Sequence, residues 1–381
     1  MTAKAQELKA QGRTIYTFGV GEPDFATPEH IRRAAAEGLA KSSHYTAVTG
    51  TASLREAICL ATERDRGWRP SPENVTVGVG AKHVLFNLAM VLCEPGDEVV
   101  IPAPYWVSYP EQWRLFGGVP KFVQTRVEQG FLMQPEDLER ALTERTKAVI
   151  LCTPSNPTGA AYSRDELLGL VEVLRRHDCY VIVDEIYADL VYDGFEHASV
   201  ARLAPDLMDR LVVVDGVSKS YAMTGWRIGW GIAPPALTKA LAKVQGQSTT
   251  NPTAVAQIAA EAALRGPRDA VLHMREAFSA RRKKMVEGLR AIEGIRCDLP
   301  RGAFYAFPDV TGLYGIRHGD RVLATDDDVA LWQLDVCGIA AVAGTPFGAP
   351  GHIRFTYASA ENVIDEALAA LSRAVADARR G

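Results

Sequence analysis

A lysine stands directly after one of the most apolar runs of the chain. Lys219 lies in the segment SKSYAMTGWR (residues 218–227), which follows the apolar stretch 211–214. An amine delivered to the end of a buried strand can form a Schiff base with an aldehyde. The guanidinium of Arg227, eight residues later, can hold a phosphate as a bidentate fork. This spacing favours an aldehyde ligand that also carries a phosphate.

A glycine-rich turn offers a second group for the phosphate. The segment VGVGAK (residues 77–82) ends a strand and opens a helix expected over 81–92. Glycine lets the backbone approach a ligand closely, and a helix N-terminus directs free N–H groups at an anion. We therefore expect Gly80, Ala81 and Lys82 near the phosphate, together with Ser218. A short glycine turn is also the ordinary form of a tight strand–helix connection.

Asp184 and Tyr187, at the end of another predicted strand, could bind the polar atoms of an aromatic ring. In VIVDEIY (residues 181–187), Asp184 ends an apolar strand and Tyr187 follows three residues later. A carboxylate there can hold a pyridine nitrogen protonated, which makes the ring an electron sink. Tyr187 can donate to the phenolate oxygen of such a ring. The alternative for Asp184 is a helix N-cap after the strand.

Three more residues suit a substrate or a ring. Asn156, in PSNPTG (154–159), could hydrogen-bond the phenolate oxygen and a substrate carboxylate, although Asn-Pro and Thr-Gly are also turn dipeptides. Trp106, in PYWVSY (104–109), could stack on a ring or lie in the core. Arg354, in HIRFTY (352–357), could clamp an α-carboxylate with two parallel bonds or face solvent. Together the motifs favour a pyridoxal-phosphate enzyme.

The elements between these motifs alternate in type. Apolar, β-branched runs predict strands, and periodic runs between them predict helices. The expected strands are 74–79, 98–102, 148–153, 180–184, 211–215 and 228–232, and the expected helices are 81–92, 164–176 and 234–244. This order predicts an α/β fold with a largely parallel sheet covered on both faces. Ligands bind beyond the C-terminal strand ends of such sheets, which is where the motifs fall.

The pattern of predicted helices and strands changes after about residue 265. A long charged helix is expected over 269–292, followed by short alternating runs at 303–307 and 352–356. We interpret this part as a smaller α+β domain, joined by an N-terminal edge strand at 15–20. The predicted division is a large cofactor-binding domain, 23–267, and a discontinuous small domain, 1–22 with 268–381.

Composition limits the class of protein. The chain has 381 residues and a formal net charge of −4, which gives no general field for nucleic acid or an anionic membrane. No apolar run is long enough for a membrane span, and no signal peptide is evident, so we expect a cytoplasmic protein. The cysteines show no metal-binding spacing, and no metal is expected. We interpret them, Cys152 and Cys179 among them, as small buried hydrophobes.

The order of the motifs adds a family resemblance. GEPDF, GVGAK, PYWVSYP, NPTG, DEIY, SKSYAMTGWRIG and a late RFTY resemble the class I/II aminotransferases of pyridoxal-phosphate fold type I, over nearly the whole chain. The chain looks closest to the bacterial aspartate aminotransferase branch, subgroup Iβ, some members of which also use prephenate. The resemblance implies a seven-stranded, mostly parallel sheet between helices plus the small α+β domain.

The resemblance also implies roles for single residues. Lys219 would bind the cofactor covalently and move the substrate proton, with Asp184 on the pyridine nitrogen and Tyr187 and Asn156 beside the phenolate oxygen. Trp106 would stack on the ring. Arg227, Ser218 and the backbone at Gly80 and Ala81 would take the phosphate. Arg354 and Gly21 would hold the α-carboxylate, and Lys82 the distal carboxylate of aspartate or glutamate. Tyr45, in HYT (44–46), would reach the phosphate of a neighbouring subunit, which implies a homodimer with sites at the interface.

The expected activity is transfer of an amino group from an L-amino acid, of the aspartate or glutamate type, to a 2-oxo acid by ping-pong kinetics. The alternatives are a lyase, cyclase or oxidase on the same scaffold, or a transaminase for a non-acidic amino acid in specialised metabolism. A cofactor-sensing regulator would need a DNA-binding domain, and a catalytically silent protein would not need the intact motifs.

Two departures from the family pattern concern the site. Gly216 stands three residues before Lys219, where many relatives have serine, so one phosphate donor is expected to be lost. The family's N-terminal segment, which covers the active site, is expected to be missing or cut by a misassigned start, because the chain begins almost at the helix before Gly21.

Overall fold

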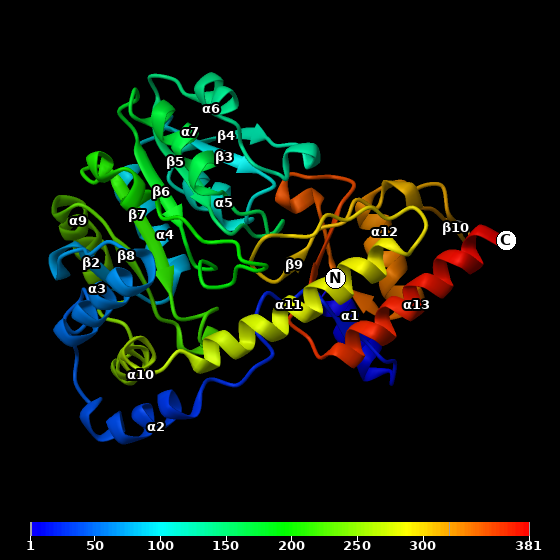
Figure 1. The fold of residues 1–381 in the computed structure, drawn as a ribbon, viewed down its shortest axis with the longest axis horizontal. Helices are drawn as coiled ribbons and strands as arrows, with labels where there is room; N and C mark the ends of the chain where they lie inside the picture. The colour runs from blue at the N-terminus through cyan, green and yellow to red at the C-terminus, as the bar shows by residue number, and fades with distance from the viewer. Residues whose placement is uncertain (1, 320, 381) are drawn as a thin grey trace.

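The computed structural model describes residues 2–319 and 321–380. The chain forms two lobes, and the long helix α11 (Asp269–Arg290) runs from one to the other (Figure 1, yellow). The larger lobe is built on a sheet, and both ends of the chain lie in the smaller lobe (Figure 1).

The large sheet has seven strands in the order β2-β8-β7-β6-β5-β3-β4. The strands are β2 (Val75–Gly78), β3 (Glu98–Ala103), β4 (Val119–Gln124), β5 (Thr146–Cys152), β6 (Tyr180–Asp184), β7 (Leu211–Gly216) and β8 (Gly229–Ile232). β8 runs antiparallel to both of its neighbours, and the other pairs are parallel. The predicted α/β fold with a mostly parallel seven-stranded sheet is confirmed.

Both faces of this sheet are buried, which explains why its strands are apolar at successive positions. On β7, Leu211 and Val213 belong to the core on one face, whereas Val212 and Val214 belong to the core on the other. The first face packs against α2 (Glu29–Gly38), α3 (Ala52–Arg66), α6 (Pro135–Ala141), α7 (Arg164–Leu174), α8 (Val200–Leu203) and α10 (Ala254–Arg265). The second packs against α4 (Ala81–Leu92), α5 (Ser108–Arg114) and α9 (Pro235–Gly246).

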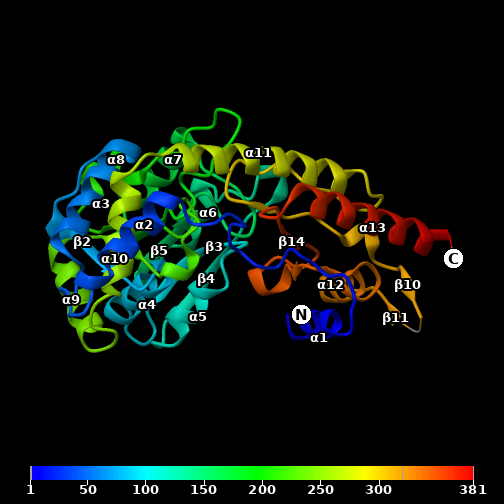
Figure 2. The same cartoon turned by 90° about the horizontal axis from the view of Figure 1, so that it is seen from below.

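The smaller lobe has its own apolar core, which includes Phe18, Phe278 and Phe355. Its elements are α1 (Thr2–Ala10), β1 (Tyr16–Thr17), β9 (Tyr305–Ala306), β10 (Arg317–His318), β11 (Arg321–Val322), α12 (Asp326–Trp332), β12 (Ile339–Ala340), β13 (Val342–Ala343), β14 (Ile353–Thr356) and α13 (Glu361–Arg380). α11 and α13 lie along one side of this lobe, and α1 and α12 lie on the other (Figure 2).

The N-terminal segment pairs with the C-terminal part of the chain. β1 runs parallel to β12, although it is two residues long rather than the six expected over 15–20. β14 pairs antiparallel with β13 and β9 and so brings Arg354 and Tyr305 into one small sheet. The division at residues 22/23 and 267/268 stays a prediction.

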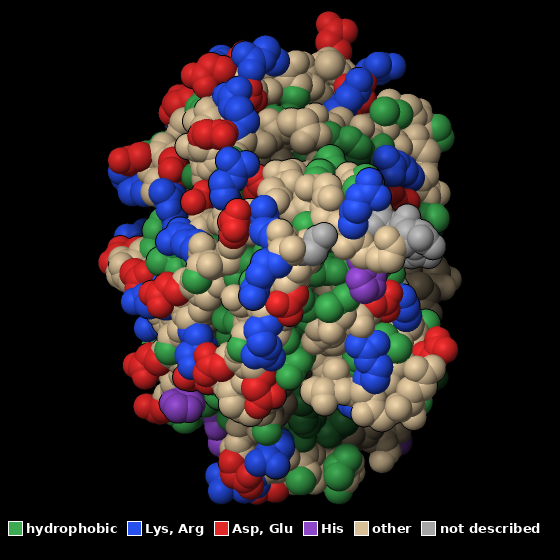
Figure 3. All heavy atoms as spheres, turned by 90° about the vertical axis from the view of Figure 1, so that its right-hand side faces the viewer, with side chains coloured by type: hydrophobic (Ala, Val, Ile, Leu, Met, Phe, Trp, Pro, Cys, Tyr) green, Lys and Arg blue, Asp and Glu red, His purple; other side chains and the backbone are tan. Residues whose placement is uncertain are grey.

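The surface at the end of the smaller lobe carries charges of both signs, interspersed with one another (Figure 3). Charged side chains of this lobe pair directly, as in Lys284–Asp365 and Arg379–Glu293. Among residues 2–319 and 321–380, none of the helices combines the length and the apolar character that crossing a bilayer requires.

Candidate active site

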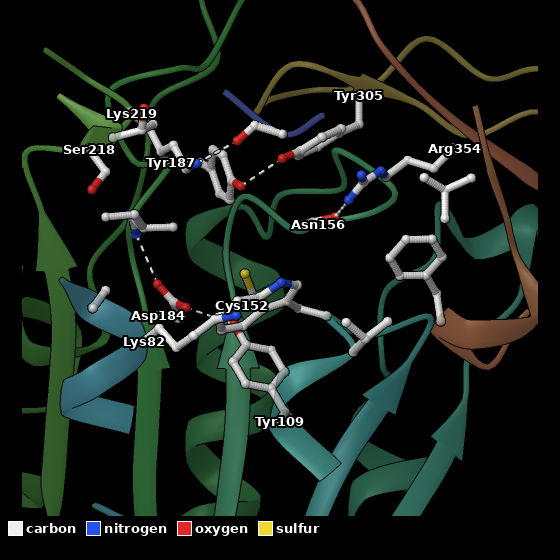
Figure 4. Close-up of a pocket in the computed structure, with 18 of the residues that line it drawn as sticks. Lys82, Tyr109, Cys152, Asn156, Asp184, Tyr187, Ser218, Lys219, Tyr305 and Arg354 are labelled. Carbon is white, nitrogen blue, oxygen red and sulfur yellow. Dashed lines mark hydrogen bonds between the residues drawn. The ribbon is translucent and has the colours of Figure 1, made fainter. Parts of the chain in front are cut away.

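A cavity of about 630 Å³ lies where the C-terminal ends of the sheet strands meet the smaller lobe. Figure 4 shows side chains from both lobes pointing into it. The predicted residues that line it are Gly21, Ala81, Lys82, Trp106, Asn156, Asp184, Tyr187, Ser218, Lys219, Arg227 and Arg354. The fold therefore brings together residues that are more than 300 positions apart in the sequence.

Lys219 lies in the turn after β7, and its side chain is largely buried. Its Nζ donates to the backbone oxygen of Gly21 at 2.6 Å. Burial lowers the pKa of the Lys219 ammonium to about 8, with help from the positive charges of Arg227 and Arg354. Near neutral pH a useful fraction of this amine is therefore unprotonated, which is the form that attacks a carbonyl.

Asp184 ends β6 and is buried at the base of the cavity. Its Oδ2 accepts from the Tyr109 hydroxyl at 2.7 Å, and its Oδ1 accepts from the Ile186 N–H at 3.1 Å. Burial raises the pKa of the Asp184 carboxyl to about 6, against the lowering effect of these two bonds. The N-cap alternative is not seen, because the residues after Asp184 form turns rather than a helix.

Arg354, on β14, is only 7% exposed, so the solvent-facing alternative is wrong for it. Its Nη1 donates to the side-chain oxygen of Asn156 at 2.9 Å, and its Nη2 donates to the Gly19 backbone oxygen at 2.7 Å. The guanidinium lies 4.7 Å from the Tyr305 ring centre and 5.0 Å from that of Phe347. Two rings and two acceptors therefore fix the plane of the fork before any ligand arrives.

The opposite end of the cavity suits an anion. The first N–H groups of α4 have no partner within the helix, and they begin at Ala81. Gly80 has φ +82°, and a Cβ there would lie 2.4 Å from Nη2 of Arg227. The missing side chain leaves room for the guanidinium beside the helix N-terminus, with Ser218 on the same cavity wall.

Gly216 has a packing reason to be glycine. It pairs with Gly229 on β8, and a Cβ at position 216 would lie 3.0 Å from the Gly229 Cα and 3.0 Å from the Ile228 oxygen. A serine Cβ there would be in tighter contact than usual, so its neighbours would have to shift by a few tenths of an ångström. The glycine at position 216, where a phosphate donor is expected to be lost, thus lets β7 and β8 pack closely.

Lys82 lies at the mouth of the cavity. Its Nζ is 4.8 Å from the ring centre of Trp106, which also lines the cavity rather than the core. The wall continues with the apolar residues Val107, Val342, Pro346 and Phe347. This part of the cavity offers the Lys82 ammonium beside an aromatic ring and apolar side chains.

Two predicted residues lie outside the cavity lining. Gly80 stands directly behind it, next to Ala81. Tyr45 is 88% exposed, which is a large exposure for an aromatic side chain. Cys152 packs against the apolar core on the second face of the sheet as a small hydrophobe, but it is only partly buried, because it also lines the cavity at the end of β5. In the part of the chain that the structure describes, no group of His, Cys, Asp and Glu side chains could hold a metal ion.

The lining also includes two tyrosines that the sequence reasoning missed. Tyr109 follows Trp106 by three residues and meets its ring edge-on at 5.3 Å. That helical spacing was a usable signal. Tyr305 lies 118 residues after Tyr187, yet the two hydroxyl oxygens are 2.9 Å apart. No local pattern connects them.

Comparisons with known proteins agree over nearly the full length. The sequence model of the family described as "Aminotransferase class I and II" matches residues 13–371. An aspartate/prephenate aminotransferase of Cereibacter sphaeroides is 46% identical over 372 residues, which are 97% of this chain and 93% of that protein. An aspartate aminotransferase of Geobacillus stearothermophilus is 43% identical over 98% of this chain and 94% of its own length. The crystal structure of the Rhizobium meliloti aspartate aminotransferase superposes with a TM-score of 0.95 at 41% identity, covering 99% of this chain and 94% of that one.

Proposed function

Because the chain belongs to the class I and II aminotransferase family, we propose that it moves the amino group of aspartate or glutamate to a 2-oxo acid, with pyridoxal phosphate as its cofactor. Family membership confirms the resemblance and the aminotransferase activity expected from the sequence. The cofactor, the acidic substrate and the residue roles below are the content of the proposal.

The cavity fits this cofactor at both of its ends. The α4 N-terminus, Ser218 and Arg227 would hold the phosphate, in the space that the missing Gly80 side chain leaves. Asp184, with both oxygens already accepting one bond each, would keep the pyridine nitrogen protonated. Trp106 would cover the ring, and Tyr187 and Asn156 would bind its phenolate oxygen. Lys219 would attach through its amine.

When bound, pyridoxal phosphate supplies a carbonyl that condenses with amines and a ring that accepts the electron pair from the substrate Cα. The chain's own residues would bind the substrate and transfer its proton. Lys219, once free, would take the proton from the substrate Cα, for which its lowered pKa is suited. Arg354 would hold the α-carboxylate so that the Cα–H bond faces this amine.

The acidic substrate is argued from the two cations of the cavity. Arg354 is rigid and prepared for a planar carboxylate, whereas Lys82 lies over Trp106 and can follow a second carboxylate. Without a distal carboxylate, Lys82 would gain nothing from the substrate. This contrast favours a dicarboxylic amino acid over a neutral one.

Arg354→Lys should lower kcat/KM by about 100-fold, because an ammonium cannot form two parallel bonds to one carboxylate and leaves Asn156 less well paired. Most of the loss should be in KM for both the amino donor and the 2-oxo acid. Steady-state kinetics of each half-reaction checks this. A variant with unchanged KM for both substrates would contradict the clamp.

The observation that carries the proposal is the buried amine of Lys219, which shares one cavity with Asp184 and Arg354. The test is a half-reaction screen in which the holoenzyme is mixed with single amino acids and the cofactor absorbance is followed. Aspartate and glutamate should discharge the band and yield their 2-oxo acids. If both are inert while a neutral amino acid reacts, the acidic preference is wrong.

Lys82→Met sharpens this screen. It should slow the reaction with aspartate by about 10–100-fold, the loss of one charge-assisted contact, and leave the reaction with alanine nearly unchanged. Lys239→Met, at an exposed lysine of α9, is the matched control and should change neither rate.

We also propose a homodimer in which Tyr45 binds the cofactor phosphate of the partner subunit. The 88% exposure of Tyr45 and its position outside its own cavity support this arrangement. Light scattering of the holoenzyme gives its mass, and a monomer would contradict the proposal.

A further inference from the structure

The hydroxyls of Tyr187 and Tyr305 meet between the two lobes of the molecule. Tyr187 follows β6 of the large sheet, and Tyr305 lies on β9 of the smaller lobe. Their oxygens are 2.9 Å apart, and Figure 4 shows the contact at the upper side of the cavity. Both side chains are almost completely buried, so water does not compete for this bond.

Tyr305 is held firmly in place. It is 1% exposed, its backbone pairs with Thr356 on β14, and its ring packs 4.8 Å from that of Phe304. The Arg354 guanidinium covers its face at 4.7 Å. Its hydroxyl lies so close to Gly21 that a Cβ at that position would be 2.5 Å from the oxygen. The position of this oxygen is therefore set by contacts with β14, with the neighbouring Phe304 and with the segment at Gly21.

The direction of the bond follows from counting protons. Each hydroxyl has one proton to donate. If Tyr187 donates to the phenolate oxygen of the cofactor, as in the proposed function, its proton is committed there. Its own oxygen can then only accept, so Tyr305 must be the donor in the contact between them.

We propose that Tyr305 is a positioning residue of the reaction, which donates to Tyr187 and thereby directs the Tyr187 proton at the phenolate oxygen of the bound cofactor. The proposal rests on the proposed function. Tyr305 acts through Tyr187 and need not touch the reacting atoms.

The physical effect is on the acidity of the bound cofactor. A hydroxyl that accepts one hydrogen bond becomes a stronger donor in the next, because bonds in a chain polarise one another. The Tyr187 bond therefore favours the ionised phenolate, and Tyr305 strengthens that preference. The charged or titratable groups that face the two tyrosines are Arg354 on β14, Cys152 on β5 and Lys219 after β7. All three groups are present in the wild type and in both tyrosine variants.

The experiment is a pH titration of the cofactor absorbance in substrate-free holoenzyme. Tyr187→Phe should raise the pH midpoint by about one to two pH units, since it removes a bond to a charged oxygen. Tyr305→Phe should raise it by about half a unit. The double variant should match Tyr187→Phe alone, because Tyr305 has no route to the cofactor without Tyr187.

Tyr192→Phe is the matched control. The Tyr192 hydroxyl also crosses to the segment before β9, where it donates to the Ala303 oxygen, but it does not line the cavity. This variant should lose stability and keep the wild-type pH midpoint of the cofactor absorbance. Thermal unfolding of each holoenzyme verifies that the Tyr305→Phe protein is folded.

The possible outcomes distinguish failure of the Tyr305 role from failure of the proposed function. A wild-type midpoint in Tyr305→Phe, with a raised midpoint in Tyr187→Phe, would overturn the positioning role and leave the proposed function intact. Additive shifts in the double variant would also overturn it, because Tyr305 would then act independently of Tyr187. If the wild-type protein binds no cofactor at Lys219, the proposed function itself fails and the inference falls with it.

Discussion

Replacing Lys219 by alanine should reduce turnover by about 10⁴-fold or more, because one amine supplies both the covalent attachment and the proton transfer at the substrate Cα. Among the residues that the structure describes, Lys82 is the other lysine of the cavity lining. It lies at the mouth with its Nζ over the Trp106 ring, so it is not placed to replace Lys219.

The measurement combines single turnovers with chemical trapping. Borohydride treatment of the wild-type holoenzyme should leave a stable cofactor adduct at position 219, and the variant should leave none there. A small primary amine added to the variant should restore part of the proton transfer. Turnover by the variant at the wild-type rate, without added amine, would exclude the role of Lys219.

Much of the fold could be predicted because its determinants are local. β5, β6 and β7 are apolar at successive positions, since helices cover both faces of the sheet, and such runs are visible in any window of the sequence. β4 was missed for the opposite reason. It is an edge strand that contains Pro120 and Lys121 and is largely exposed, so its sequence lacks the apolar signal.

The same distinction applies to the site. Asp184 ends one parallel strand, and Lys219 and Asn156 follow two others. Parallel strands bring their C-terminal ends to one edge of the sheet, so the convergence of these residues could be predicted. Tyr305 belongs to another lobe, and its contact with Tyr187 depends on how β9 pairs with β14. Such a contact is fixed by tertiary structure and leaves no pattern in sequence spacing.

Two positions, Cys152 and Gly216, show what residue spacing in the sequence cannot reveal. Cys152 ends an apolar strand, and the sequence cannot say that the strand end opens on a cavity. Gly216 departs from the family pattern, and the loss of a phosphate donor there stays a prediction; the sequence alone does not show that Gly229 approaches it closely on the neighbouring strand. In both cases the deciding neighbour is remote in the chain.

Asp184→Asn should have opposite effects on activity and on stability. Turnover should fall by about 10³-fold, the scale of losing one preorganised electrostatic contact to the reacting system, because a neutral amide does not hold the pyridine nitrogen protonated. The amide can keep the existing neighbours satisfied, with its oxygen on the Ile186 N–H and its nitrogen donating to Tyr109. The cofactor-free variant should therefore fold normally.

The stability gain follows from the pKa of Asp184. Burial raises this pKa from 3.8 to about 6 in the folded, cofactor-free protein. A carboxyl with a raised folded pKa binds its proton more tightly when folded, so stability falls as pH rises from about 4 to about 6 and stays reduced above that range. Asparagine does not ionise. Above pH 6 the variant should thus be more stable than wild type by about 3 kcal/mol, and below pH 4 the difference should vanish.

Urea unfolding of the cofactor-free proteins near both pH limits measures this difference. Asp206→Asn is the control of opposite sign, because Arg175 binds both oxygens of Asp206 and lowers its pKa to about 2. That substitution should give no gain in stability at neutral pH.

If Asp184→Asn were instead less stable than wild type at neutral pH, the buried carboxylate would be stabilising the cofactor-free protein. A structural role would then explain why an aspartate stands at this position. A carboxylate that weakens the cofactor-free protein would be stabilised by a cationic partner in the cavity, and the protonated pyridine nitrogen of the proposed cofactor would be such a partner.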